Sequence, residues 1–250
     1  MAARTKSKTA LVICIQEIKE DGSSMNLGNQ VSEEDVHNLH QAFIADSINN
    51  ALLLPKVDVK LFYSPHARTR QSVEIIINYL KGRSKGKKKT ALDGERLEIA
   101  ELSPGGWGMK IDESFHRCFD QGYNRVVFIG SRTPTLTCDR LIDALKVLDR
   151  TDVVIGPTVE GRYYMIGFTG GYQVMLADFD WWASNIYSQV ATHIDKMGLS
   201  WEETEVWYAV ENPEDVEYLV RDINHFRLTG DEETARETEK ALERILNRMA

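Results

Sequence analysis

The stretch that decides the fold runs from Asn124 to Thr169 and reads NRVVFIG SRTPTLT CDRLIDALKVLD RTDVVIGP TVEG RYYMIGFT. Its first apolar, β-branched run, 126–129, predicts a buried strand that ends at Gly130. The polar loop 131–134 follows, and Thr137 then begins a helical pattern with one apolar face. Strand, polar loop and helix in this order predict an open α/β sheet, in which ligands bind at the carboxyl ends of the strands.

Two more strands follow this helix at close range. Residues 153–155 form an apolar run that ends at Gly156-Pro157, and residues 163–168 form another. A connection this short cannot be a crossover, so the two strands are predicted to run antiparallel. Elsewhere, strands are expected at 10–15, 57–63, 96–102 and 205–210, and helices from Ser32 and at 69–80, 111–119, 185–197, 213–226 and 231–249.

This alternation of strands and helices predicts a single α/β domain over residues 1–250. Helices are expected on both faces of a mostly parallel sheet, which gives a three-layer α/β/α sandwich with one late antiparallel strand. Residues 228–250 are expected to form a C-terminal helical extension. The basic, glycine-broken stretch 81–90 (KGRSKGKKKT) is predicted to be a solvated loop rather than a binding patch.

Composition and charge exclude several classes of protein. The 250 residues are 42% apolar and 27% charged, and the net charge of −8 argues against nucleic-acid binding, which needs a basic footprint. No stretch is long and apolar enough to predict a membrane span, and the amino-terminal apolar run is too short for a signal peptide. Cys14, Cys118 and Cys138 form no CxxC pair, which is typical of buried thiols in a reducing compartment. We expect a cytoplasmic protein with neither a nucleic-acid nor a membrane partner.

Common catalytic motifs are absent from the sequence. It contains no GxxxxGK[ST] phosphate loop, no GxGxxG after the first strand and no GxSxG elbow. His37 and His40 lie three residues apart on a predicted helix and could share a metal, but without a third ligand nearby they are expected to face solvent. The glycine-rich loop 105–108 could approach a phosphate closely or serve only as a turn. Trp181 and Trp182 could stack on a ligand or cover an edge of the core.

Four motifs occur in an order and spacing that resemble a bacterial family. GSRTPTL begins at Gly130, DVVIGP at Asp152, EGRYYMIGF at Glu160 and VENPEDVEYL at Val210. They are similar to DUF2064, a family of nucleotide-diphospho-sugar transferase-like proteins with the GT-A glycosyltransferase fold, some members of which are linked to arsenosugar biosynthesis. The resemblance covers nearly the whole chain. It implies a GT-A-like domain that binds a nucleotide sugar or a sugar phosphate at the loop after the central strand.

The charged positions depart from the family pattern. The family loop G-S-D-x-P-x-L has an aspartate where this chain has Arg132, D-G-G-Y-Y-L-I-G has a glycine at Arg162, and D-V-D-T-P-E-D has its first carboxylate at Ala209. The resemblance implies Mg²⁺ or Mn²⁺ held by carboxylates, which neutralises the pyrophosphate. An arginine in place of a metal ligand repels the ion by roughly 4 kcal/mol at a surface-like dielectric constant. We therefore expect no metal ligands, and weakened or lost metal-dependent catalysis.

Three interpretations follow. In the first, the protein is a transferase in which Arg132 and Arg162 clamp phosphate directly, and a carboxylate is the base for an acceptor hydroxyl. In the second, it binds its ligand without chemistry, and in the third it is a scaffold protein derived from the family. A simpler alternative for both arginines is that they face solvent or pair with Glu160. The catalytic candidates are Glu160, Glu211 and Asp215, and the substrate-binding candidates are Gly105, Gly106, Gly130, Ser131, Arg132, Thr133, Gly161, Arg162 and Tyr163.

Overall fold

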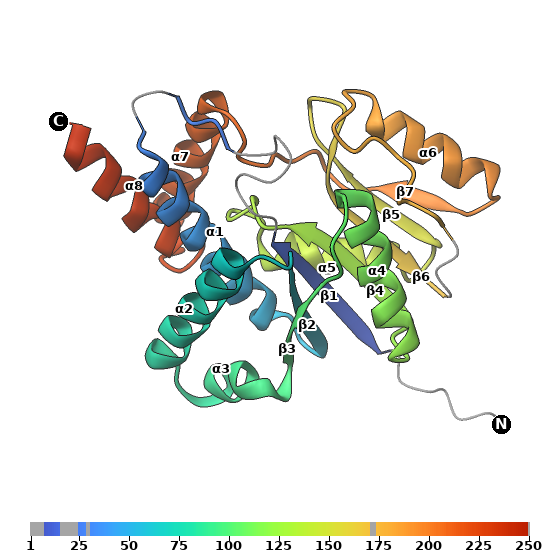
Figure 1. Ribbon diagram of the computed structural model, residues 1–250, viewed down its shortest axis with the longest axis horizontal. Helices are drawn as coiled ribbons and strands as arrows, with labels where there is room; N and C mark the ends of the chain where they lie inside the picture. Colours follow the sequence, from blue (N-terminus) through green and yellow to red (C-terminus); the bar gives the residue numbers. More distant parts are fainter. Residues whose placement is uncertain (1–7, 16–24, 29–30, 171–173, 250) are drawn as a thin grey trace.

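The computed structural model describes residues 8–15, 25–28, 31–170 and 174–249, and its centre is one seven-stranded sheet (Figure 1). The strands are β1 (Thr9–Ile15), β2 (Val57–Tyr63), β3 (Leu97–Glu101), β4 (Arg125–Gly130), β5 (Val153–Pro157), β6 (Tyr163–Thr169) and β7 (Trp201–Glu203). Their order across the sheet is β3-β2-β1-β4-β6-β5-β7. Neighbouring strands run parallel except at β6, which is antiparallel to both β4 and β5. The predicted mostly parallel sheet with one late antiparallel strand is therefore confirmed.

Helices cover both faces of this sheet, which confirms the three-layer arrangement. They are α1 (Glu33–Leu53), α2 (Ala67–Arg83), α3 (Gly86–Thr90) with a π-helical turn after it (Ala91–Glu95), α4 (Trp107–Asp120), α5 (Cys138–Val147), α6 (Ile186–Lys196), α7 (Pro213–Leu228) and α8 (Arg236–Met249). Figure 1 shows α7 and α8 beside α1 at one end of the molecule, and α6 beside β5 and β7 at the other.

Strand β1 is buried along its whole length because both of its faces contribute to a core. Leu11 and Ile13 join the core that α1, α2 and α5 cover, whereas Ala10 and Val12 join the core that α4 and α6 cover. A third apolar cluster joins α1 to α7 and α8. Full burial of a leucine or isoleucine side chain contributes about 1.5–3 kcal/mol, so these cores fix the sheet that positions the loops at its carboxyl edge.

Helix starts follow the capping residues of the sequence. The Ser32 hydroxyl accepts a hydrogen bond of 3.1 Å from the backbone N–H of Asp35 at the start of α1. Thr137 accepts one of 3.4 Å from the N–H of Arg140 at the start of α5. Each bond satisfies an N–H that the helix itself cannot, which is worth about 1 kcal/mol. The start of α5 also fixes the end of the loop that leaves β4.

Three predictions of secondary structure are wrong, two in the type of structure and one in where a helix begins. Residues 205–210 are not a strand: the edge strand is β7, and the chain then leaves the sheet apart from an isolated bridge between Thr158 and Trp207. The stretch 81–90 is largely helical, because α2 extends through Arg83 and its lysines favour the helix α3. The last helix begins at Arg236 instead of residue 231. Asp231 Oδ1 accepts hydrogen bonds from the N–H groups of Glu233 and Thr234, which forms a turn before the helix.

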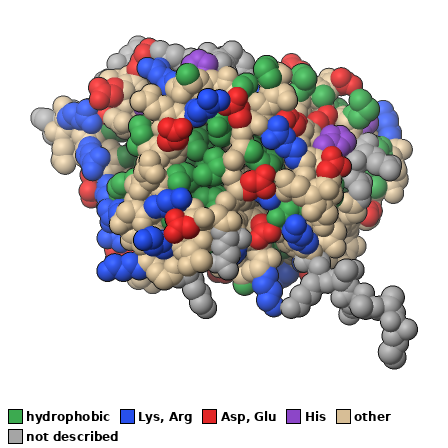
Figure 2. Space-filling view, turned by 60° about the horizontal axis from the view of Figure 1, so that its bottom comes forward, with side chains coloured by type: hydrophobic (Ala, Val, Ile, Leu, Met, Phe, Trp, Pro, Cys, Tyr) green, Lys and Arg blue, Asp and Glu red, His purple; other side chains and the backbone are tan. Residues whose placement is uncertain are grey.

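The described surface carries many charged side chains, and the three cysteines are unpaired. Charged side chains of both signs surround a central group of apolar side chains on the face that Figure 2 shows. Within the described ranges, no helix combines the length and the apolar character that crossing a bilayer requires. Cys14 and Cys118 are buried and Cys138 is partly exposed, and all three are free thiols.

Candidate functional site

A pocket of about 80 Å³ lies at the carboxyl end of β4, where the loop 131–134 leaves the sheet. Small-molecule pockets usually measure about 300–1,000 Å³, so this one has room for a single chemical group. The lining residues are Cys14, Trp107, Gly130, Ser131, Arg132, Thr133, Arg162, Tyr163, Tyr164, Trp181, Trp182, Ala209 and Glu211.

One glutamate joins two arginines in this pocket. Arg132 Nη1 lies 3.5 Å from Glu211 Oε1, and Arg162 Nη1 lies 2.9 Å from Glu211 Oε2. Arg132 is only 8% exposed, whereas Arg162 and Glu211 are partly exposed. The simpler alternative, in which both arginines face solvent or pair with Glu160, does not hold, because both contact Glu211 and Glu160 lies outside the lining. Among the described residues, these two guanidinium groups and one carboxylate sum to a net charge of +1, which favours an anionic ligand.

His40 supports the loop from below. Its Nε2 lies 2.8 Å from Ser131 Oγ, and both side chains are buried. The expectation that His40 faces solvent is wrong, because α1 is covered by the sheet on one side and by α7 and α8 on the other. Burial, and to a smaller extent the nearby charge of Arg132, lowers the pKa of His40 to about 3. So weak a base does not take a proton from serine near neutral pH, so His40 positions Ser131.

His37, one helical turn earlier, lies in a different environment. It is partly exposed, and its Nε2 lies 3.0 Å from Gln41 Nε2 and 3.4 Å from Ser72 Oγ. Since Nε2 of His40 is engaged with Ser131, the two histidines bond in different directions and share no metal site.

Thr133 presents an unsatisfied hydroxyl at the pocket. The residue is 2% exposed, and its Oγ1 has no hydrogen-bond partner among the described residues. A buried hydroxyl without a partner costs about 1–3 kcal/mol. An acceptor or donor from a ligand would remove this cost, which makes Thr133 an indicator of where a ligand binds.

Aromatic side chains form another part of the pocket lining. Trp107 Nε1 donates a hydrogen bond of 2.8 Å to the Tyr163 hydroxyl, and the rings of Tyr163 and Trp181 meet edge to face at 4.8 Å. Burial raises the pKa of Tyr163, so its hydroxyl stays neutral. Trp181 is buried and donates to the Leu176 carbonyl at 2.9 Å, so it covers the core. Trp182 is partly exposed and is the indole available to a ligand.

The remaining candidates lie beside the pocket and not in its lining. Asp215 is buried, and its Oδ2 accepts hydrogen bonds of 2.8 Å from the N–H groups of Glu211 and Asn212, so it caps α7 and orients Glu211. Gly161 has φ +75°, and a Cβ there would lie 2.7 Å from the Ser184 carbonyl oxygen, so only glycine fits this turn. Gly105 and Gly106 precede α4 and lie outside the lining, whereas Trp107 directly after them is part of it.

The lining does not fit a divalent cation. Glu211 is its one carboxylate among the described residues, and two guanidinium groups already bind it. Mg²⁺ and Mn²⁺ prefer several oxygen ligands and are repelled by neighbouring cations. Across the ranges that the structure describes, no group of three or more His, Cys, Asp or Glu residues is placed to hold a metal ion.

Comparison with solved structures defines the class of fold. A protein of Desulfovibrio desulfuricans G20, provisionally described as a nucleotide-diphospho-sugar transferase, superposes with a TM-score of 0.71 at 21% identity over 96% of this chain and 98% of that one. A cytidylyltransferase from Leptospira borgpetersenii gives 0.54 at 11% identity over 95% and 94% of the two chains. The 4-diphosphocytidyl-2C-methyl-D-erythritol synthase of Anaerococcus prevotii gives 0.52 at 9% identity over 87% and 97%. The fold is therefore that of the GT-A-like nucleotide-diphospho-sugar transferases and nucleotidyltransferases.

Sequence comparison identifies the family within this class. Residues 48–182, more than half of the chain, match the family described as "Uncharacterized protein conserved in bacteria (DUF2064)". The chain belongs to the DUF2064 family, which confirms the resemblance seen in its motifs. None of the curated proteins is a significant match.

Proposed function

We propose that the protein binds a nucleotide sugar or a sugar phosphate at the loop after β4, with the phosphate held by Arg132 and Arg162 in place of a metal ion. The observation that supports this most directly is the convergence of both arginines on Glu211 in a pocket with a net charge of +1. The unsatisfied Thr133 hydroxyl supplies a further donor at the same place. Two fold relatives are named for nucleotide or nucleotide-sugar chemistry, which is compatible with this ligand class.

The size of the pocket supports a phosphate, and not the whole ligand, as the group in its interior. A volume of about 80 Å³ suits a phosphate group, and the sugar or nucleoside would then lie outside, toward Trp182. A planar guanidinium donates two parallel hydrogen bonds to a phosphate, and such charged hydrogen bonds contribute about 1.5–3 kcal/mol each. Arg132 is held by burial and Arg162 by its bond of 2.9 Å to Glu211, so little side-chain entropy is lost when a ligand binds.

Metal-dependent transfer is weakened or lost in this proposal, because the described lining residues include one carboxylate, Glu211, and a metal would need several. Any residual transfer would use Glu211 as the base for an acceptor hydroxyl, since it is the candidate carboxylate that lines the pocket. Asp215 would act only through Glu211, because its carboxylate accepts a hydrogen bond from the backbone N–H of that residue. Binding without chemistry is the alternative function, and the engagement of Glu211 by two arginines favours it.

Calorimetric titration with UDP-glucose, GDP-mannose, CTP and pyrophosphate, each in EDTA and in Mn²⁺, tests the proposal. We expect at least one of these ligands to bind equally well in both conditions. Arg132→Ala removes one positive charge and should weaken that binding about tenfold, or about 1.4 kcal/mol. Arg150→Ala is the matched control, because Arg150 pairs with Glu202 at an exposed site outside the pocket. Binding that requires Mn²⁺, or an Arg132→Ala variant that binds like wild type, would contradict the proposal.

The exchange of Glu211 for glutamine should separate binding from chemistry. It keeps the shape of the side chain and raises the net charge of the cluster from +1 to +2. Unit charges roughly 5 Å apart interact by roughly 3 kcal/mol at an effective dielectric constant of about 20, and solvent screening in this open pocket reduces the effect. We expect Glu211→Gln to tighten metal-free pyrophosphate binding about tenfold and to abolish any transfer activity. Weaker binding would show instead that Glu211 is needed to hold the arginines in place.

A further inference from the structure

A second cavity, of about 270 Å³, lies where the end of α2, the helix α3 and the region before and at the start of α8 meet α1. It shares no lining residue with the pocket at β4. Its lining residues come from four separate segments: Asn49 from α1, Tyr79, Leu80 and Arg83 from α2, Ser84, Lys85 and Lys88 around α3, and Glu233, Arg236 and Glu237 at α8.

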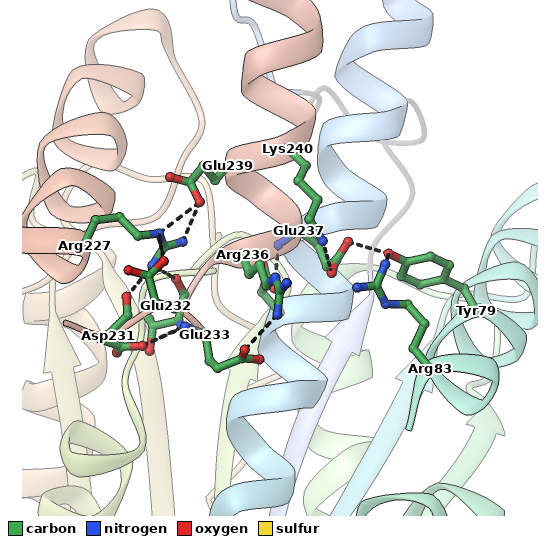
Figure 3. Close-up of polar contacts among 12 residues, drawn as sticks. Tyr79, Arg83, Arg227, Asp231, Glu232, Glu233, Arg236, Glu237, Glu239 and Lys240 are labelled. Atoms are coloured by element: carbon green, nitrogen blue, oxygen red, sulfur yellow. Dashed lines mark hydrogen bonds and ion pairs between the residues drawn. The ribbon is translucent and has the colours of Figure 1, made fainter. Parts of the chain in front are cut away.

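Cationic side chains outnumber anionic ones in the lining of this cavity, and the anionic ones already have partners. Four cationic and two anionic side chains line it. Both carboxylates are already bound, as Figure 3 shows: Arg236 Nη1 contacts Glu233 Oε1 at 2.7 Å, and Glu237 accepts from Lys240 at 2.8 Å and from the Tyr79 hydroxyl at 2.6 Å. Both acids are therefore already hydrogen-bonded elsewhere, and they act on Arg83 and Lys88 only through longer-range attraction.

Three cations remain without a direct carboxylate partner in the described part of the chain. Arg83 donates only to the neutral Tyr79 hydroxyl, at 3.0 Å (Figure 3). Lys88 lies on the short helix α3 and Lys85 directly before it, and both line the cavity. Lys88 is partly buried, and this burial lowers its pKa, although Glu233 and Glu237 oppose the shift. An anion between these three side chains would compensate the partly buried charge of Lys88 and attract the exposed charges of Arg83 and Lys85.

An unsatisfied acceptor lies in the same cavity. The buried Oδ1 atom of Asn49 has no hydrogen-bond partner among the described residues. It therefore needs a donor, such as a hydroxyl group. The wall around it is fixed, because the buried Asp46 carboxylate accepts from the N–H groups of Glu237 and Thr238 at 3.1 and 2.7 Å and so ties the start of α8 to α1.

We infer that this cavity is a binding site for a small phosphorylated sugar or polyol, separate from the pocket at β4. Arg83, Lys85 and Lys88 would bind the phosphate, and Asn49 would accept from a hydroxyl of the ligand. The volume of about 270 Å³ is close to the lower end of small-molecule pockets, about 300 Å³, and suits a phosphorylated monosaccharide better than a nucleotide sugar. The prediction of a plain solvated loop for 81–90 gave no sign of this cavity, because the pattern of lysines does not reveal that Lys88 lies near Asn49 and Glu237.

Titration of the full-length Arg132→Ala protein with glucose 6-phosphate, inorganic phosphate and glucose tests the inference without a contribution from Arg132 in the first pocket. We expect glucose 6-phosphate to bind with one-to-one stoichiometry, phosphate to bind more weakly and glucose to bind least. Adding Lys85→Ala and Lys88→Ala should weaken glucose 6-phosphate binding about tenfold or more, since charged hydrogen bonds are lost. Adding Asn49→Ala should reduce the preference for glucose 6-phosphate over phosphate and leave phosphate affinity unchanged.

Lys89→Ala is the matched control, because Lys89 is exposed on the same helix and does not line the cavity. It should change the affinity by less than about twofold, the effect of an exposed charge at a distance. The inference is wrong if the wild-type cavity binds no phosphate compound at millimolar concentration, if Lys85→Ala with Lys88→Ala leaves the affinity unchanged, or if Lys89→Ala weakens it equally. A loss of binding only in Arg132→Ala would assign all phosphate binding to the first pocket.

Discussion

Replacing Arg132 with aspartate is expected to weaken metal-free binding of UDP-glucose or pyrophosphate about hundredfold and to make the remaining binding depend on Mn²⁺. The substitution changes the cluster charge from +1 to −1, whereas Arg132→Ala changes it only to zero. If each unit of charge changes the ligand affinity about tenfold in this partly solvent-screened pocket, a change of two units changes it about hundredfold. The new carboxylate beside Glu211 would also restore the position that the family pattern assigns to an aspartate.

Titration in EDTA and in increasing Mn²⁺ would measure this change from metal-free to Mn²⁺-dependent binding, with Arg132→Ala as the comparison. The alanine variant lacks the positive charge but adds no oxygen ligand, so its binding should stay independent of Mn²⁺. A urea denaturation curve at pH 7 would show whether the loss of the largely buried guanidinium has unfolded the protein. Metal-free binding that survives in Arg132→Asp would show that the phosphate lies elsewhere and would overturn the arginine clamp.

The fold could be predicted from local patterns to a large extent. Apolar runs located β1, β2 and β4, and the short connection between β5 and β6 predicted their antiparallel pairing. Errors arose where tertiary contacts replaced sheet hydrogen bonds. Beyond β7, the N–H of Val210 donates to the carbonyl of Arg132 at 2.9 Å, so an apolar segment that resembles a strand is held by a loop. No periodicity in the sequence contains that information.

The candidate site was chosen from its motifs, and its contacts could not be predicted from them. The motif at Gly130 located the loop, and the family pattern drew attention to Arg132 and Arg162. Their common partner Glu211 lies 79 and 49 residues away from them, and His40 lies 91 residues from Ser131. Contacts over such separations depend on how α1 and α7 pack against the sheet. A helical pattern with one apolar face also gives no sign that its polar face is buried, which is why His40 was placed in solvent.

The buried histidine should make the protein sensitive to acid. The pKa of His40 is about 3 in the folded state and about 6.5 when exposed, so below pH 6.5 the unfolded state takes up the proton more readily. The stability that this group contributes is present above pH 6.5 and is lost as pH falls toward 3. Between pH 7 and pH 5 the contribution of His40 to the free energy of unfolding falls by about 2 kcal/mol. In His40→Gln this contribution is absent, so the variant should lose about 2 kcal/mol less than wild type over that interval.

The comparison must be made between variants at each pH, because a second buried group acts in the opposite direction. Burial raises the pKa of Asp46 to about 6, so the folded state takes up this proton first and gains stability as pH falls through that value. Asp46 is present in wild type and in His40→Gln, so its contribution cancels in their difference. Urea denaturation at pH 7 and pH 5 would measure that difference. His37→Gln is the control and should show a smaller effect, because His37 is partly exposed. Equal acid sensitivity in wild type and His40→Gln would show that His40 can accept a proton in place, and therefore that its contact with Ser131 does not require the neutral ring.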